Sequence, residues 1–198
     1  MPRLWFGTLR QWHWISSALC LVGMLLFAIT GITLNHAASI EARPQVHHHQ
    51  ARLPEALQRA LLDDPPSRGL PATLRGWLES ELDISLAGRE AEWSHGELYV
   101  ALPRPGGDAW LSLDLGSGEL EYERTDRGWI SWFNDLHKGR HTGLAWSLFI
   151  DVFAVACVLF SLTGLLLLQR HAGARPGTWP LVGAGLVIPV LLALLFIH

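Results

Sequence analysis

The sequence predicts a mainly α-helical membrane protein with three transmembrane helices and a small α+β domain between helices 1 and 2, outside the cytoplasm. The chain has 198 residues, of which 49% are hydrophobic and 17% are charged, which is too apolar for an ordinary soluble domain. The apolar residues form three long runs instead of being spaced periodically. In contrast, seventeen of the eighteen acidic residues lie between Glu41 and Asp135.

The three apolar runs cover residues 13–35, 142–169 and 178–197. The first and third contain no Asp, Glu, Lys or Arg, and the second contains only Asp151. About 20 apolar residues cross the roughly 30 Å of hydrocarbon in a bilayer, so each run is long enough to span it. We expect the first run to be an uncleaved anchor, because it is longer than the apolar region of a signal peptide and no small-residue cleavage site follows it.

Basic residues in the short flanking segments predict the orientation. Arg3 and Arg10 precede the first run, Arg170 and Arg175 follow the second, and no acid accompanies them. Lys and Arg near the ends of membrane helices favour the cytoplasmic side. We therefore expect a protein of the bacterial inner membrane, in contact with lipid, with its N-terminus in the cytoplasm and its C-terminus in the periplasm.

The resulting organisation has four parts. They are residues 1–36 (cytoplasmic N-terminus and helix 1), 37–135 (the periplasmic domain), 136–171 (helix 2) and 172–198 (a cytoplasmic turn and helix 3). Within the periplasmic domain, the apolar spacing predicts a helix over 53–63, and a second short helix is expected over 72–82. Alternation predicts strands over 97–102, 109–115 and 119–124, with glycine-rich hairpin turns between them.

Five of the ten histidines stand at the boundaries of the predicted helices: His13, His36, His137, His141 and His171. Each side of the membrane thus has a histidine from each of two antiparallel helices. Ligation of haem iron by two imidazoles requires this arrangement, one ring approaching from each side of the porphyrin. The alternative is that these are ordinary interfacial residues, because the headgroup zone is wet.

Asp151 is the one formal charge inside a predicted span. Carboxylates within membrane helices are rare and usually functional, so we expect it to face the helix bundle and to relay a proton or contact a cofactor. Alternatively, it hydrogen-bonds a Trp or Ser of a neighbouring helix. Small residues at Gly23, Gly31, Gly143 and Gly164 would leave room for a flat macrocycle, or for ordinary helix packing.

A run of three histidines, His47, His48 and His49, together with His95, suggests a metal site outside the membrane. Consecutive side chains cannot all point at one ion, and we expect the run to lie in a flexible loop, so incidental binding is the alternative. The chain has no GxGxxG, P-loop, CxxCH, HExxH or GxSxG pattern. Electrons would therefore come from a separate donor, and no nucleic-acid partner is expected.

Several segments resemble the PepSY-associated transmembrane family. They are RQWHWISSALCLVGMLLFAITGITLNH in the first span, LDLGSGEL in the outer domain, NDLHKGRHTG before the second span, and ID and LTGLLLL within it. Larger members of the family resemble inner-membrane ferrisiderophore reductases that carry b-type haem and reduce iron in the periplasm. The resemblance implies that the outer domain is PepSY-like.

By position, the resemblance implies that His13, His36, His137 and His171 ligate haem iron, with His141 able to replace His137. One or two haem b groups with bis-histidine ligation would then be present. The chain has fewer spans than its larger relatives, and a homodimer would supply the missing helices.

The leading hypothesis is therefore a haem-b protein that moves single electrons from a cytoplasmic or quinol donor to a ferric siderophore or another ferric chelate in the periplasm. It would act as a ferric-chelate reductase or as an electron-transfer subunit. The alternative is a membrane-tethered PepSY-type binding or regulatory module without redox activity. A third interpretation is metal-ion handling through His47, His48 and His49.

Overall fold

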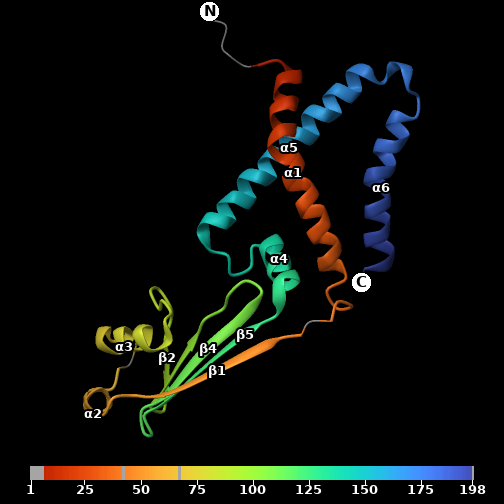
Figure 1. Cartoon of the computed structure of the whole chain (residues 1–198). Helices are drawn as coiled ribbons and strands as arrows, with labels where there is room; N and C mark the ends of the chain where they lie inside the picture. The colour runs from red at the N-terminus through yellow and green to blue at the C-terminus, as the bar shows by residue number, and fades with distance from the viewer. Residues whose placement is uncertain (1–6, 42, 67, 198) are drawn as a thin grey trace, which may run out of the picture. The chain divides into compact units, whose positions relative to one another are not determined.

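The computed structural model describes residues 7–41, 43–66 and 68–197. Arg3 and the C-terminal His198, which enter the predicted orientation, lie outside these residues. The described chain contains six α-helices and one five-stranded antiparallel sheet, and the sheet lies in the sequence between the first helix and the last three (Figure 1).

Three helices are long and apolar enough to cross a membrane: α1 (Leu9–Asn35), α5 (Gly143–His171) and α6 (Thr178–Phe196). The 27 residues of α1 extend about 40 Å at 1.5 Å per residue, which exceeds the hydrocarbon thickness. These helices confirm the three predicted spans, with boundaries that differ by a few residues. No residue of α6 is buried within the described chain, so lipid or another protein would have to cover it.

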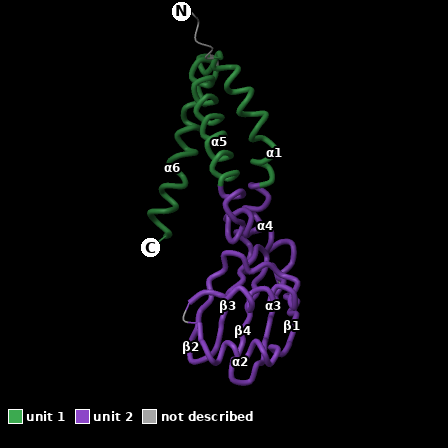
Figure 2. Tube along the Cα trace, turned by 90° about the vertical axis from the view of Figure 1, so that its left-hand side faces the viewer, with its two compact units in different colours: residues 1–26, 148–198 green, residues 27–147 purple. Residues whose placement is uncertain are grey.

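The chain divides into two compact units, coloured separately in Figure 2. The first unit contains the N-terminal part of α1, most of α5, and α6. Here α1 and α5 cross (Figure 1). Small or polar side chains lie at their contact. Ser16 and Cys20 of α1 and Thr163 of α5 are buried. Small residues let two helices approach closely, which is how membrane helices gain van der Waals contact.

The second unit, residues 27–147, contains the sheet. Its strand order is β1-β5-β4-β3-β2, and every neighbouring pair is antiparallel. The strands are β1 (Gln45–Arg52), β2 (Glu92–Ser94), β3 (Glu97–Ala101), β4 (Gly107–Asp114) and β5 (Glu119–Asp126). The predicted strands correspond to β3, β4 and β5, whereas β1 and β2 were not predicted.

The core of this unit lies between one face of the sheet and two helices, α2 (Glu55–Asp63) and α3 (Ala72–Leu82). In β4, buried and more exposed residues alternate, since successive side chains point to opposite faces of a strand. The buried leucines that meet there are Leu61, Leu74, Leu78, Leu98, Leu111, Leu113 and Leu120. Both helices were predicted, and the structure confirms them.

A further helix, α4 (Gly128–Lys138), follows β5 and was not predicted as a separate element. Its contact with the β3–β4 turn depends on Gly106, which has a φ of +71°. A Cβ on Gly106 would lie 2.7 Å from Cβ and 2.8 Å from Cα of Trp132, so only glycine fits. The Gly106 N–H also donates to the buried carboxylate of Asp135 at 2.9 Å.

The second unit is called the outer unit below, because the orientation expected from the sequence places its sheet outside the membrane. Truncation of Leu111 tests its core. Because Leu111 is fully buried, Leu111→Ala should lower the free energy of unfolding of this unit by about 2–5 kcal/mol. Hydrogen–deuterium exchange of the β3, β4 and β5 amides in the intact, detergent-solubilised protein measures the change. Leu62→Ala, at a position 49% exposed on α2, is the matched control and should change it by less than about 0.5 kcal/mol. Equal protection in both variants would contradict this assignment of the core.

Candidate functional site

His13 lies in the first turns of α1 and contacts α5 through three features. Its Nδ1 is 3.0 Å from Oγ1 of Thr163. Its ring is stacked on Phe160, with ring centroids 5.0 Å apart and an interplanar angle of 12°. A Cβ on Gly164 would lie 3.3 Å from Cε1 of His13, so the missing side chain makes room for the imidazole. His13 is half-buried and closely packed, unlike a residue that only marks a membrane boundary.

His137, in α4, makes an equivalent set of contacts with the C-terminal part of α1. Its Nδ1 is 2.7 Å from Oγ1 of Thr30. The ring lies 4.9 Å from the ring of Phe27 at 44°, and a Cβ on Gly31 would lie 3.6 Å from Cε1. One turn from Thr30, the Thr33 hydroxyl donates to Oδ1 of Asn134 at 2.8 Å. The outer unit thus also holds an imidazole against a phenylalanine, a threonine and a glycine.

Within the described residues, His36 and His171 each bond a backbone carbonyl of their own helical segment. Nδ1 of His36 is 3.0 Å from the carbonyl oxygen of Ile32, and Nδ1 of His171 is 2.8 Å from that of Leu167. Both side chains are exposed. A carbonyl oxygen can only accept, so Nδ1 carries the proton in both rings and Nε2 keeps its lone pair.

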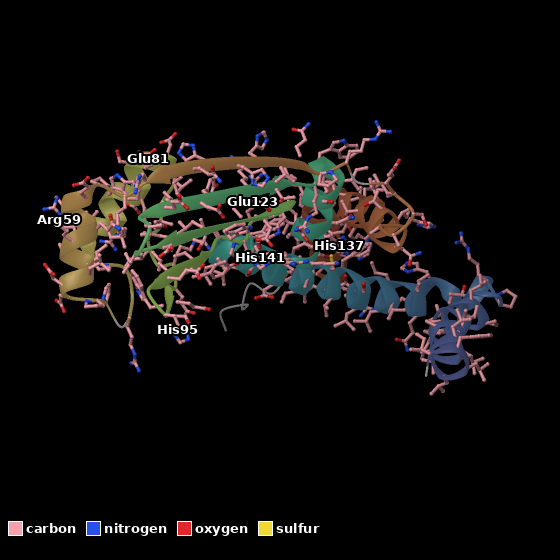
Figure 3. All side chains as sticks on the ribbon, turned by 90° about the horizontal axis from the view of Figure 1, so that it is seen from below. Arg59, Glu81, His95, Glu123, His137 and His141 are labelled. Carbon is pink, nitrogen blue, oxygen red and sulfur yellow. The ribbon has the colours of Figure 1, made fainter. Side chains whose placement is uncertain are left out.

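His141 differs from the other four candidates. It lies between α4 and α5 with a φ of +57°, a left-handed conformation that few residues other than glycine adopt. Its Nε2 accepts a hydrogen bond from Nε of Arg140 at 3.1 Å. Figure 3 labels His137 and His141, which come from different segments of this unit. Nε2 of His141 is therefore already engaged, whereas within the described residues Nε2 of His137 makes no hydrogen bond.

Asp151 does not face the contact between α1 and α5. Its side chain is exposed on α5, and within the described residues it makes no hydrogen bond or ion pair. The expectation that it faces the interior of the helix bundle, or bonds a Trp or Ser of a neighbouring helix, is therefore not met within one chain. Its role as a site residue stays a prediction.

The three consecutive histidines lie in β1, not in a flexible loop as expected, and β1 pairs with β5 along its whole length. His48 contacts Glu123 of β5 at 3.4 Å, whereas His49 contacts Glu81 of α3 at 3.3 Å, on the other face of the sheet. His95 lies at a turn away from His137 (Figure 3). Among the described residues, no three His, Cys, Asp or Glu side chains are grouped so that they could hold a metal ion.

Side chains fill the gaps left by the glycines of α1 and α5. His137 lies at Gly31, His13 lies at Gly164, and the ring of Phe153 covers Gly23 so closely that a Cβ there would overlap it. Phe153 is also stacked on Phe149, with centroids 6.1 Å apart. These three glycines therefore accommodate rings of the chain itself, instead of leaving a free space for a macrocycle.

An open groove on the outer unit is lined by three arginines, Arg89, Arg104 and Arg124, beside Tyr122. Arg104 pairs with Asp126 at 3.0 Å. The pKa of Asp126 is lowered, chiefly by the hydrogen bond from the Gly128 N–H and further by the positive charge of Arg104. Within the described chain, the guanidinium groups of Arg89 and Arg124 have no ion-pair partner, so they could bind an anion.

Analysis of the sequence did not identify Thr30 and Thr163, which hold the two seated imidazoles. A signal for them is present in the sequence. The pattern Phe-x-x-Thr-Gly occurs at residues 27–31 (FAITG) and again at 160–164 (FSLTG). A search for short internal repeats within the apolar runs would have found both.

The model of a family described as "Putative PepSY_TM-like" matches residues 4–198, which is almost the whole chain. No curated protein and no solved structure matches the chain.

The contact between Gly23 and Phe153 provides a test of the α1–α5 crossing. Gly23→Ala should destabilise this contact by about 1–3 kcal/mol, because the added methyl group overlaps a rigid ring. Thermal unfolding of the purified protein in detergent, followed by loss of the monodisperse species, measures it. Gly183→Ala in α6 is the control, since nothing lies within 4 Å of its Cβ position. Phe153→Leu should partly rescue Gly23→Ala, and the absence of rescue would contradict the crossing.

Proposed function

The chain belongs to the PepSY_TM-like family, and we propose that it is an inner-membrane haem-b protein that transfers single electrons to a ferric chelate in the periplasm. One observation carries the proposal. His13, His36, His137 and His171 each bond the chain through Nδ1, and within the described residues none of them bonds through Nε2. Imidazoles that are anchored at one nitrogen and open at the other suit metal ligation.

The donor set fits the proposed cofactor. Haem b held by two imidazoles supplies reversible one-electron transfer without a change of ligands. His13 and His171 belong to one unit of the chain and His36 and His137 belong to the other, which supports one histidine pair on each side of the membrane. The hydrogen bonds at Nδ1 orient the rings and raise their basicity as ligands.

The membrane setting supports transfer between two compartments. Arg10 lies in the first turn of α1, Arg170 lies in the last turn of α5, and Arg175 follows α5, which favours the cytoplasm for these ends. The outer unit then lies in the periplasm, and a cytoplasmic or quinol donor supplies the electrons. Because α6 has no buried residue within the described chain, its surface is available to lipid or to a second copy in a homodimer.

The arginine groove of the outer unit is the proposed docking site for the acceptor. Most of the acidic residues of the chain lie in this unit, so an anionic chelate would be repelled by much of its surface. Arg89, Arg104 and Arg124 form a local exception, and Tyr122 adds an aromatic face. Guanidinium groups bind carboxylates through paired hydrogen bonds, which suits a ferric siderophore or another ferric chelate with acidic ligands.

Absorption spectra of the protein purified in mild detergent test the cofactor. A sharp α-band after reduction with dithionite is expected, together with haem b in a pyridine haemochrome assay. His13→Ala or His171→Ala should lower the haem content by about half, since one of two bis-histidine sites loses a ligand. His47→Ala, on the exposed β1 strand, is the matched control and His141→Ala should behave like it. A colourless protein from haem-replete cells would contradict the proposal and favour the tethered binding module.

Charge removal in the groove tests the acceptor site. The double variant Arg89→Gln/Arg124→Gln should weaken the binding of ferric citrate about tenfold or more, because hydrogen bonds to charged groups contribute about 1.5–3 kcal/mol each. Its haem content should be unchanged. Arg59→Gln, which removes an exposed pair with Glu55 on α2, is the control. Equal ferric citrate affinity in all three proteins would place the docking site elsewhere.

A further inference from the structure

The two Phe-x-x-Thr-Gly segments are used in the same way although they lie on different helices. In each, the Phe, Thr and Gly occupy positions i, i+3 and i+4, which share one face of an α-helix. The face of residues 160–164 in α5 receives His13, and the face of residues 27–31 in α1 receives His137. Each imidazole therefore contacts a phenylalanine ring, a threonine hydroxyl and the space left by a glycine.

The hydrogen bonds of the two threonine hydroxyls bear on the tautomers of His13 and His137. A hydroxyl has one proton to donate. In Thr163 the Oγ1 donates to the backbone carbonyl oxygen of Leu159 at 2.7 Å, and it also lies 3.0 Å from that of Phe160. In Thr30 the Oγ1 donates to the carbonyl oxygen of Phe27 at 3.1 Å. A hydroxyl that gives its proton to its own helix accepts from the imidazole, and in this arrangement Nδ1 of His13 and of His137 carries the proton.

We propose that each Phe-x-x-Thr-Gly segment is an imidazole seat in which the threonine holds the opposing histidine as its Nδ1-protonated tautomer and so leaves the Nε2 lone pair available to a metal. Thr30 and Thr163 are positioning residues, because they act through His137 and His13. The identity of the metal as haem iron rests on the proposed function, whereas the tautomer does not.

Ordinary helix packing does not account for the threonines. Valine has nearly the same shape and would fill the same space between α1 and its neighbours without a hydroxyl. A hydroxyl that bonds the preceding turn of its own helix gains little for that helix. In both segments it also meets a ring nitrogen that would otherwise be an unsatisfied polar atom in an apolar contact. The need of the imidazole nitrogen for a hydrogen-bond partner therefore explains why both segments have threonine.

Nuclear magnetic resonance of the haem-free protein tests the seats without the cofactor. The full chain is produced in haem-deficient cells with ¹⁵N-histidine and studied in detergent, with His13→Gln and His137→Gln used for assignment. Both rings should show the signals of the Nδ1-protonated tautomer. Thr163→Val should shift the signals of His13 to a mixture of tautomers, and Thr163→Ser should restore the wild-type pattern. Thr30→Val should likewise shift the signals of His137 to a mixture of tautomers.

Thr33→Val is the matched control for Thr30, because Thr33 lies one turn further along α1 and bonds Asn134 instead of a ring. It should leave the signals of His137 unchanged. Unchanged signals in Thr30→Val and Thr163→Val as well would overturn the proposal, whatever the haem content of the protein.

The haem-loaded protein provides a second readout. A hydrogen bond from Nδ1 makes an imidazole a stronger donor to ferric iron, so Thr163→Val should raise the midpoint potential of the haem and weaken haem binding about tenfold. Thr163→Ser should keep both values near those of the wild type. If the threonine variants change the tautomers but the protein binds no haem, the imidazole seats stand and the proposed function fails. Failure of the seats and failure of the proposed function are therefore distinguishable.

Discussion

An imidazole placed between apolar helices must have its ring nitrogens satisfied by the protein, and this requirement organises the helical part of the chain. His13 and His137 meet it by reaching a threonine on another helix. Each threonine lies beside a glycine, so that the ring fits close to the helix, and beside a phenylalanine, which is stacked on the ring of His13 and tilted against the ring of His137. The polar contact therefore dictates where the small and aromatic residues of the partner helix must stand.

The outer unit is held to the C-terminal part of α1 through α4. Asp135 of α4 accepts the Gly106 N–H at the β3–β4 turn, while Asn134 and His137 of the same helix bond α1. One face of α4 thus contacts the sheet and another contacts the membrane helix. A folded outer unit and a seated His137 consequently depend on the same short helix.

Much of the fold was predictable, because hydropathy over long runs and alternation in short runs are local signals. The three long helices and strands β3 and β4, with their buried apolar residues, belong to this class. Strand β1 was not predictable in this way, since Val46 is its only large apolar residue and its register comes from pairing with β5, more than sixty residues away. The histidines at the helix boundaries were found from the sequence. Their partners were not, because Thr30 and His137 are 107 residues apart and only the fold brings them together.

Near its N-terminal end, helix α1 places His13 against α5. Near its C-terminal end, α1 contacts His137 of α4. A slip of α1 along its axis by a single turn, about 5.4 Å, would move His13 away from Thr163 and Thr30 away from His137 in one step. Apolar side chains alone tolerate such a slip, since leucine against leucine is much the same one turn further on. The two polar contacts therefore set the axial register of α1, against α5 in one unit and against α4 in the other.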